Sequence, residues 1–135
     1  MKIQHVPLEF VNMVWGRVEK FIVAAMEHAK GDYTAEHVKT YVTQGTWNLL
    51  VAVDDENEIH GAAAVGFYNR PNDRVAFIYA IGGRLISNPD TFAQLKAYAT
   101  SMGATVIEGA AREPIARLWS KYGFGEKHRI VGVRL

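Results

Sequence analysis

The spacing of apolar side chains changes near residue 46, and this change limits the folds that the chain can adopt. Before it, apolar residues recur at helical spacing, which is typical of helices that bury one face. After it, Trp47, Leu49, Val51 and Val53 alternate with other residues, as in a strand with one well-buried face. A chain that contains both periods in this order predicts an α/β fold.

Two helices are predicted before this change. A short alternating piece at residues 2–6 precedes Pro7, and the first helix then runs to an end near Gly31. Thr34 is expected to cap the second helix, because its hydroxyl can accept a hydrogen bond from a free backbone N–H group. Glu36 lies in the first turn of that helix, where the helix dipole stabilises a carboxylate.

Three strands are predicted next, in a meander at residues 47–53, 59–68 and 75–81. The second strand is rich in glycine and alanine, which indicates that a helix or another backbone packs closely on it. The third strand is almost continuously apolar, so we expect it at the centre of the sheet with both faces covered. Gly82 and Gly83 are expected to end it.

The remaining chain alternates between helix and strand. Asn88 is expected to cap a third helix, with Pro89 at its first position. A short strand at residues 105–108 leads to an amphipathic helix within residues 112–124, and a last strand is predicted at residues 128–135. The complete order is β-α-α-β-β-β-α-β-α-β, which predicts a mixed central sheet with helices on both faces.

Length and composition exclude several classes of function. The chain has 135 residues, which suits one domain spanning residues 1–135. Its net charge of +1 gives no electrostatic reason to expect nucleic acid or an anionic membrane as a partner. Without cysteine, the chain cannot form a disulfide, a thiolate metal site or a cysteine nucleophile. The histidines lack metal-ligand spacing and no apolar run is long enough to span a membrane, so we expect a cytoplasmic protein without a metal.

The helix predicted within residues 112–124 carries a recognisable motif. Leu118, Gly123 and Phe124 lie where the GNAT superfamily of N-acetyltransferases has similar residues on its last helix, and the order of the elements also resembles that superfamily. The resemblance covers nearly the whole chain. It implies a GNAT-like fold, acetyl-CoA as the cofactor and an amine as the acetyl acceptor. The apolar face of this helix is predicted to hold Ile115, Leu118, Trp119 and Tyr122.

The chain departs from the superfamily's pattern at three positions of this helix. Arg112 stands in place of an asparagine, Ile115 in place of an alanine and Trp119 in place of a tyrosine. That tyrosine is often proposed to protonate the departing thiolate of coenzyme A. Because an indole N–H group is not an acid, the proton must come from Tyr122, from water or from elsewhere.

The second signature of the superfamily is a glycine-rich loop that opens a helix and holds the pyrophosphate with backbone N–H groups. The corresponding stretch is residues 82–90, where the glycines come early in the loop. Pro89 removes one N–H group, and Asp90 adds a carboxylate that would repel a pyrophosphate. Arg84 is interpreted either as a phosphate clamp or as a solvated loop cation.

The resemblance also implies which residues form the site. Acetyl-CoA would lie along the end of the central strand, whose backbone would pair with the pantetheine amides and polarise the thioester carbonyl. Tyr122 would be the acid, and Glu108 or His60 the general base; a structural role is the alternative for each, and core packing is the alternative for Trp119. The expected cofactor contacts are Tyr79, Ala80, Ile81, Gly82, Gly83, Arg84, Asn88 and Trp119.

A second hypothesis keeps the fold without the chemistry. The substitutions at Arg112 and Trp119, together with the altered loop, favour a binding or scaffold protein. Compact GNAT-like proteins with degenerate cofactor loops are frequent in tailed-phage genomes, and this resemblance implies virion assembly or host interference, in the virion or in the host cytoplasm. We also expect that the chain can form a homodimer, in which the strand at residues 61–66 or the last strand contacts a second subunit.

Overall fold

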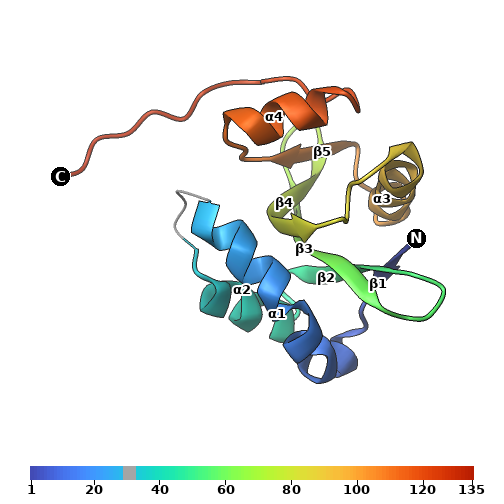
Figure 1. Ribbon diagram of the computed structural model, residues 1–135. Helices are drawn as coiled ribbons and strands as arrows, with labels where there is room; N and C mark the ends of the chain where they lie inside the picture. Colours follow the sequence, from blue (N-terminus) through green and yellow to red (C-terminus); the bar gives the residue numbers. More distant parts are fainter. Residues whose placement is uncertain (29–32) are drawn as a thin grey trace.

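The structure is a computed structural model that describes residues 1–28 and 33–135, and it confirms a mixed α/β fold with helices on both faces of one sheet (Figure 1). The predicted end of the first helix near Gly31 lies outside the described residues. The elements are β1 (Lys2–His5), the 3-10 helix η1 (Leu8–Phe10), α1 (Val11–His28), α2 (Ala35–Thr43), β2 (Asn48–Val53), β3 (Ile59–Asn69), β4 (Arg74–Gly83), α3 (Pro89–Ser101), β5 (Val106–Gly109) and α4 (Glu113–Ser120).

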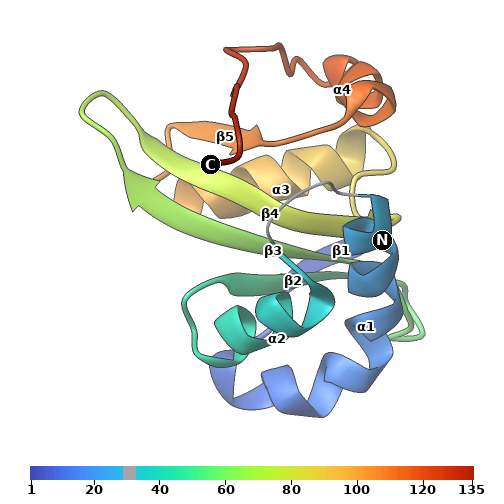
Figure 2. The same cartoon turned by 90° about the vertical axis from the view of Figure 1, so that its left-hand side faces the viewer.

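The five strands lie in the order β1-β2-β3-β4-β5. Each of β1 to β4 runs antiparallel to its neighbour, so the predicted meander of three strands is confirmed. β5 instead runs parallel to β4, because α3 carries the chain back across the sheet between them (Figure 2). The sheet therefore has two edges, β1 on one side and β5 on the other.

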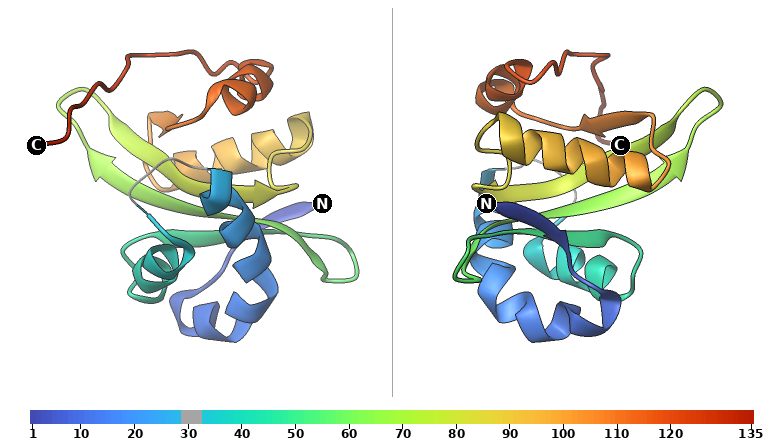
Figure 3. Two further views of the ribbon diagram at one scale, coloured as in Figure 1. Left: turned by 60° about the vertical axis from the view of Figure 1, so that its left-hand side comes forward. Right: turned by 90° about the vertical axis from the view of Figure 1, so that its right-hand side faces the viewer.

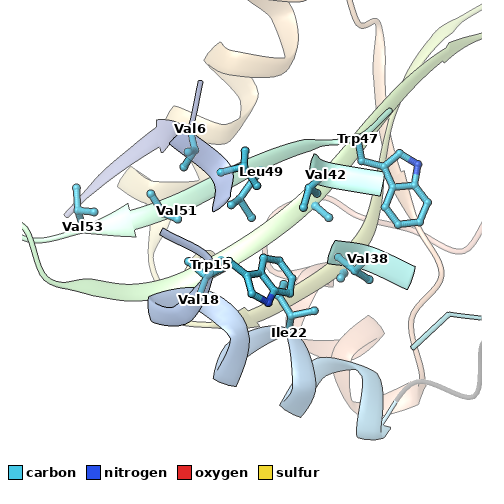
Figure 4. Packing of buried hydrophobic residues seen from close by; sticks show 14 residues of the cluster. Val6, Trp15, Val18, Ile22, Val38, Val42, Trp47, Leu49, Val51 and Val53 are labelled. Atoms are coloured by element: carbon cyan, nitrogen blue, oxygen red, sulfur yellow. The ribbon is translucent and has the colours of Figure 1, made fainter. Parts of the chain in front are cut away.

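Two apolar layers fill the space between the sheet and its helices. α1 and α2 cover one face (Figure 4), and α3 and α4 cover the other. In β2, Leu49 and Val51 point toward α1 and α2, whereas Leu50 and Ala52 belong to the layer under α3. The prediction of one buried face for this strand was therefore wrong, because helices cover the sheet from both sides.

Both predicted N-caps are confirmed. The Thr34 hydroxyl accepts a hydrogen bond from the His37 N–H at 3.3 Å, and the Asn88 side chain accepts one from the Thr91 N–H at 2.9 Å. The expected end of the third strand differs. Gly82 and Gly83 continue β4 instead of ending it, because both pair with β3.

The chain after α4 forms no strand in the described structure, so the last strand predicted at residues 128–135 was wrong. A strand needs a partner edge, and here the chain runs away from the body of the protein (Figures 1 and 3). The expected apolar face of α4 is also incomplete. Trp119 is buried at 6% exposure, whereas Leu118 is 43% exposed, because this short helix packs at the margin of the sheet.

Candidate functional site

β4 and β5 separate part of the way along the sheet. They pair from Val75 with Val106 to Ile78 with Gly109, and β5 then ends. Beyond that point β4 continues through residues 79–83, and within the described strands this stretch pairs only with β3. On the side away from β3, its backbone groups therefore have no strand partner among the described residues, and they offer a row of donors and acceptors to a ligand that contains amides.

The separation coincides with a β-bulge. Ala80 pairs with Ala64 and Ile78 pairs with Val65, which leaves Tyr79 as the extra residue of β4. A bulge increases the local twist and turns the following residues. Ala80 is buried toward α1 and α2, and the partly buried Ile81 packs against the opposite layer.

Aromatic rings gather beside the bulge. The ring of Tyr79 stacks on Trp47, with centroids 4.0 Å apart and an angle of 9° between the planes. Phe77 lies 4.7 Å and Tyr33 6.0 Å from the Tyr79 ring, between centroids. We call Tyr33, Trp47, Phe77 and Tyr79 the aromatic wall. Sequence reasoning missed it because its members come from three separate parts of the chain.

The phenol of Tyr79 is suited to donating a hydrogen bond. Burial raises its pKa above the ordinary value of 10.0, because a phenolate would lose solvation there, and the neighbouring Tyr33 and Tyr68 add to this shift. The group therefore stays protonated at neutral pH. It can orient a ligand, and it is a poor base.

Glu108 lies on β5 opposite Phe77 of β4, on the face of the sheet that carries the aromatic wall. Its carboxylate accepts hydrogen bonds from Arg70 and, at 2.9 Å, from the Lys127 ammonium. The pKa of Glu108 is lowered below the ordinary value of 4.5, mainly by the hydrogen bond from the Arg70 guanidinium and, to a lesser extent, by the one from Lys127. The Glu108 carboxylate is thus ionised, and the two cations balance its charge. The ion pairs link β5 to the segments that hold Arg70 and Lys127, and they make the carboxylate a weaker base.

His60 lies at the other end of the candidate site. Its Nε2 atom is 2.7 Å from Asp54, and this hydrogen bond is the main reason that the pKa of Asp54 is lowered. The His60 carbonyl accepts a hydrogen bond from the Arg84 N–H at 2.8 Å, which places His60 beside the end of β4. Because a strand rises about 3.3 Å per residue, Gly83 lies about 20 Å along β4 from Phe77. His60 and Glu108 therefore belong to different places.

The loop between β4 and α3 has already used most of its N–H donors. The Asn88 side chain caps α3 by accepting a hydrogen bond from the Thr91 N–H. The Thr91 hydroxyl in turn accepts hydrogen bonds from the N–H groups of Ser87 at 3.1 Å and Asn88 at 3.3 Å. Pro89, at the first helical position, has no N–H group. The exposed side chain of Arg84 remains available. The N–H groups of Ser87, Asn88 and Thr91 are thus engaged by side chains of this loop.

A groove of about 1020 Å³ runs beside the outer edge of β5. Glu108, Trp119 and Tyr122 line it, and Tyr122 also packs on Phe92 with ring centroids 5.1 Å apart. The structure thus brings two of the predicted catalytic residues to one groove. Residues 79–83 and His60 do not line it.

Residues 1–28 and 33–135 contain neither a candidate metal cluster nor a helix that could span a membrane. Within these ranges, no cluster of three or more His, Asp or Glu side chains is arranged to hold a metal ion. Over the same residues, none of the helices combines the length and apolar composition that crossing a bilayer requires.

Comparison with solved structures identifies the fold. A ribosomal-protein-alanine N-acetyltransferase from Brucella melitensis biovar Abortus is 12% identical, with 100% of both chains covered and a TM-score of 0.69. An aminoglycoside acetyltransferase from an uncultured soil metagenomic sample, solved with sisomicin, is 14% identical over 99% of this chain and 94% of that one, with a TM-score of 0.67. A predicted acetyltransferase from Clostridium acetobutylicum, solved with acetyl-CoA, is 13% identical over 98% and 95% of the two chains, with a TM-score of 0.64.

No protein-family model and no curated protein matches the chain. At these sequence identities the structural likeness shows the fold alone. The chain has the GNAT fold, as its element order and its last helix predicted.

Proposed function

We propose that this protein is an N-acyltransferase that takes an acetyl group from acetyl-CoA and transfers it to an amine. The observation that carries the proposal is the unpaired edge of β4 at residues 79–83, where β5 has ended. When bound, acetyl-CoA supplies an acetyl group activated as a thioester. Backbone N–H groups at this edge would donate hydrogen bonds to ligand carbonyls and stabilise negative charge on the attacked one.

The two ends of the candidate site fit such a ligand differently. The β4 edge fits the pantetheine arm, whose amides can pair with backbone groups as a strand does. The α3 N-terminus does not fit the pyrophosphate, because Asn88 and Thr91 occupy its donors. In this proposal Arg84 supplies the contact to phosphate through its side chain alone.

The remaining residues would orient the reactants. The aromatic wall lies on the face of the sheet where β4 and β5 separate, and it would offer the substrate an apolar surface to pack against. Glu108 is held between two cations, so a water molecule rather than this carboxylate would take the proton of the amine. Tyr122 lines the groove beside β5, which residues 79–83 do not line, so water would supply the proton to the departing thiolate. Orientation supplies much of the acceleration in an enzyme without a strong acid and base.

The proposal is tested by nuclear magnetic resonance of the isotope-labelled protein during titration with acetyl-CoA. We expect amide shifts to change first at residues 79–83, and those of β1, the opposite edge of the sheet, to stay constant. Enzymatic transfer to a panel of primary amines follows if binding is seen. Unchanged amide spectra at millimolar acetyl-CoA would contradict the proposal.

A second candidate function is binding without catalysis, and two observations favour it. The N-terminus of α3 is capped by the Asn88 side chain, and Glu108 forms ion pairs with Arg70 and Lys127. A chain of this kind would use the GNAT fold as a scaffold, and a role in virion assembly or host interference rests on the sequence resemblance. The absence of a rise in melting temperature with acetyl-CoA would favour this candidate, since a ligand that binds only the folded state must raise it.

A further inference from the structure

An aromatic surface remains partly exposed on the face of the sheet that α1 and α2 cover. The aromatic wall lies at one end of the apolar layer under these helices, where Figure 4 shows the Trp47 indole. Trp47 is 7% exposed, whereas Tyr33 is 36% exposed, and Phe77 and Tyr79 are half-buried. Tyr68, whose ring centroid lies 6.5 Å from that of Phe77, is also 36% exposed. An exposed group of aromatic side chains is typical of a surface that binds a ligand.

A glycine holds two of these rings close to the sheet. A Cβ atom on Gly66 of β3 would lie 2.6 Å from Cε2 of Tyr79 and 2.8 Å from Cδ1 of Trp47. The two rings therefore rest on the backbone of β3, stacked with centroids 4.0 Å apart and an angle of 9° between their planes. Because the rings are already packed in place, a ligand would meet a preformed surface and would not have to order it.

A cluster of charges borders the wall, with one positive charge in excess. Glu108 of β5 lies opposite Phe77 of the wall. Arg70 and Lys127 both form ion pairs with the Glu108 carboxylate, so two cations surround one anion. Asp73, in the same hairpin as Arg70, instead accepts a hydrogen bond from a threonine hydroxyl at 3.0 Å. The charge beside the wall therefore suits a ligand that carries an anionic group.

Both cations keep donors for such a group. Arg70 reaches Glu108 through Nη2, and among the residues that the structure describes its other guanidinium nitrogens have no hydrogen-bond acceptor. The Lys127 side chain is 52% exposed, and an ammonium group has three donors. Because β4 lies between β3 and β5, the Arg70 side chain crosses β4 beside Phe77 to reach Glu108. A ligand carboxylate would thus meet charge-assisted donors next to the wall.

We propose, on the premise of the acetyl transfer proposed above, that the amine acceptor is an aromatic amino acid. Its ring would stack on the wall, its carboxylate would bind Arg70 and Lys127, and its nitrogen would reach the thioester at the unpaired edge of β4. One small molecule can span these places, because Glu108 is opposite Phe77 and Tyr79 lies two residues further along β4, about 7 Å away. The excess positive charge would repel a polyamine.

The transfer balances without a further reactant. The ammonium group of the amino acid first loses a proton to water. The neutral nitrogen then bonds to the acetyl carbon, the carbon–sulfur bond breaks, and the nitrogen gives up a second proton while the thiolate takes one from water. The products are an N-acetyl amino acid and coenzyme A.

A comparison of acceptors is the first test. A chromogenic disulfide measures the thiol of released coenzyme A, and the chain adds no background because it contains no cysteine. Free phenylalanine is compared with phenethylamine, which lacks the carboxylate, with alanine, which lacks the ring, and with spermidine, a polycation. We expect kcat/KM to be about tenfold higher for phenylalanine than for each of the others. Equal or better use of any of the three would overturn the proposal.

Variants then identify the contacts. Phe77→Leu keeps an apolar side chain in the wall and removes an aromatic face, so the preference for phenylalanine over alanine should fall about threefold to tenfold. Lys127→Gln should lower the preference for phenylalanine over phenethylamine by a similar factor. Phe10→Leu, at a 47% exposed position of η1, and Lys2→Gln on β1 are the matched controls and should change neither preference. Unchanged preferences in both site variants would contradict the assigned contacts.

Binding of the amino acid alone separates the proposed acceptor from the acetyl transfer on which it rests. Titration of the isotope-labelled protein with phenylalanine should shift the amide signals of Phe77, Tyr79 and Glu108, and those of β1 should stay constant. The same shifts without any binding of acetyl-CoA would support this ligand for the wall and contradict the transfer. Unchanged amide signals at these three residues with millimolar phenylalanine, both with and without acetyl-CoA, would overturn the proposal.

Discussion

The backbone of Phe21 in α1 lies directly against Gly82 in β4. A Cβ atom on Gly82 would lie 2.9 Å from the carbonyl carbon of Phe21 and still closer to its oxygen. Real side-chain atoms do not approach a backbone this closely. The helix therefore rests on the strand at a point where only glycine fits, beside the unpaired edge of β4 that is the candidate cofactor site.

Gly82→Ala should for this reason destabilise the protein. The added methyl group meets backbone rather than a flexible side chain, so α1 or β4 must shift, and we expect a loss of about 1 to 3 kcal/mol or more in the free energy of unfolding. Urea unfolding followed by circular dichroism measures it. Gly125→Ala is the control, because no atom in the described part of the chain lies within 4 Å of a Cβ there. Equal stability of the two variants would disprove the close contact.

Gly16→Ala should have the opposite effect. Gly16 lies inside α1 and is exposed, and a Cβ there would have no atom of the described residues within 4 Å. Alanine restricts the unfolded chain and favours the helix, so the free energy of unfolding should rise by about 0.5 to 1 kcal/mol. Thermal unfolding should show a higher melting temperature. A decrease would mean that this side of α1 is covered in solution.

Glu108 should make stability depend on pH. Arg70 and Lys127 lower its pKa in the folded state, so its contribution to the free energy of unfolding is present above the ordinary value of 4.5 and is lost as the pH falls through the lower folded value. Glu108→Gln should cost about 1 to 2 kcal/mol at neutral pH and flatten the acid-side decline. Glu19→Gln, at an exposed position of α1, should keep the wild-type profile. Parallel profiles for both variants would refute the role of Glu108.

Arg84→Ala should distinguish binding of the phosphates of acetyl-CoA from binding of its pantetheine arm. Acetyl-CoA carries phosphates and acetyl-pantetheine does not, so we expect the variant to bind acetyl-CoA more weakly, by about tenfold, and acetyl-pantetheine unchanged. Calorimetric titration of both ligands measures this. Lys2→Ala, which removes a cation from the opposite edge of the sheet, should change neither affinity. Equal loss for both ligands would mean that Arg84 supports the fold rather than the phosphate.

Several local features could be read from the sequence because they depend on a few neighbouring residues. Thr34 and Asn88 cap their helices as predicted, since a cap needs only a short polar side chain and the next turn. The order of the elements, together with the motif of Leu118, Gly123 and Phe124, predicted the GNAT fold. Within the candidate site, the sequence indicated Glu108 and the end of β4. The sequence did not indicate that Arg70 and Lys127 would form ion pairs with Glu108, because these pairs join residues far apart in the chain.

The order of the main helices and strands from β1 to α4 could thus be predicted from the sequence alone, because the apolar period of a segment indicates which face of it is buried. The tertiary structure decided which edges find partners. β4 and β5 separate after Ile78, β2 is covered on both faces, and residues 128–135 remain extended although their composition suits a strand. Strand pairing is a contact between segments that are distant in the sequence. The residues of one segment therefore do not show whether the fold places a partner strand beside it.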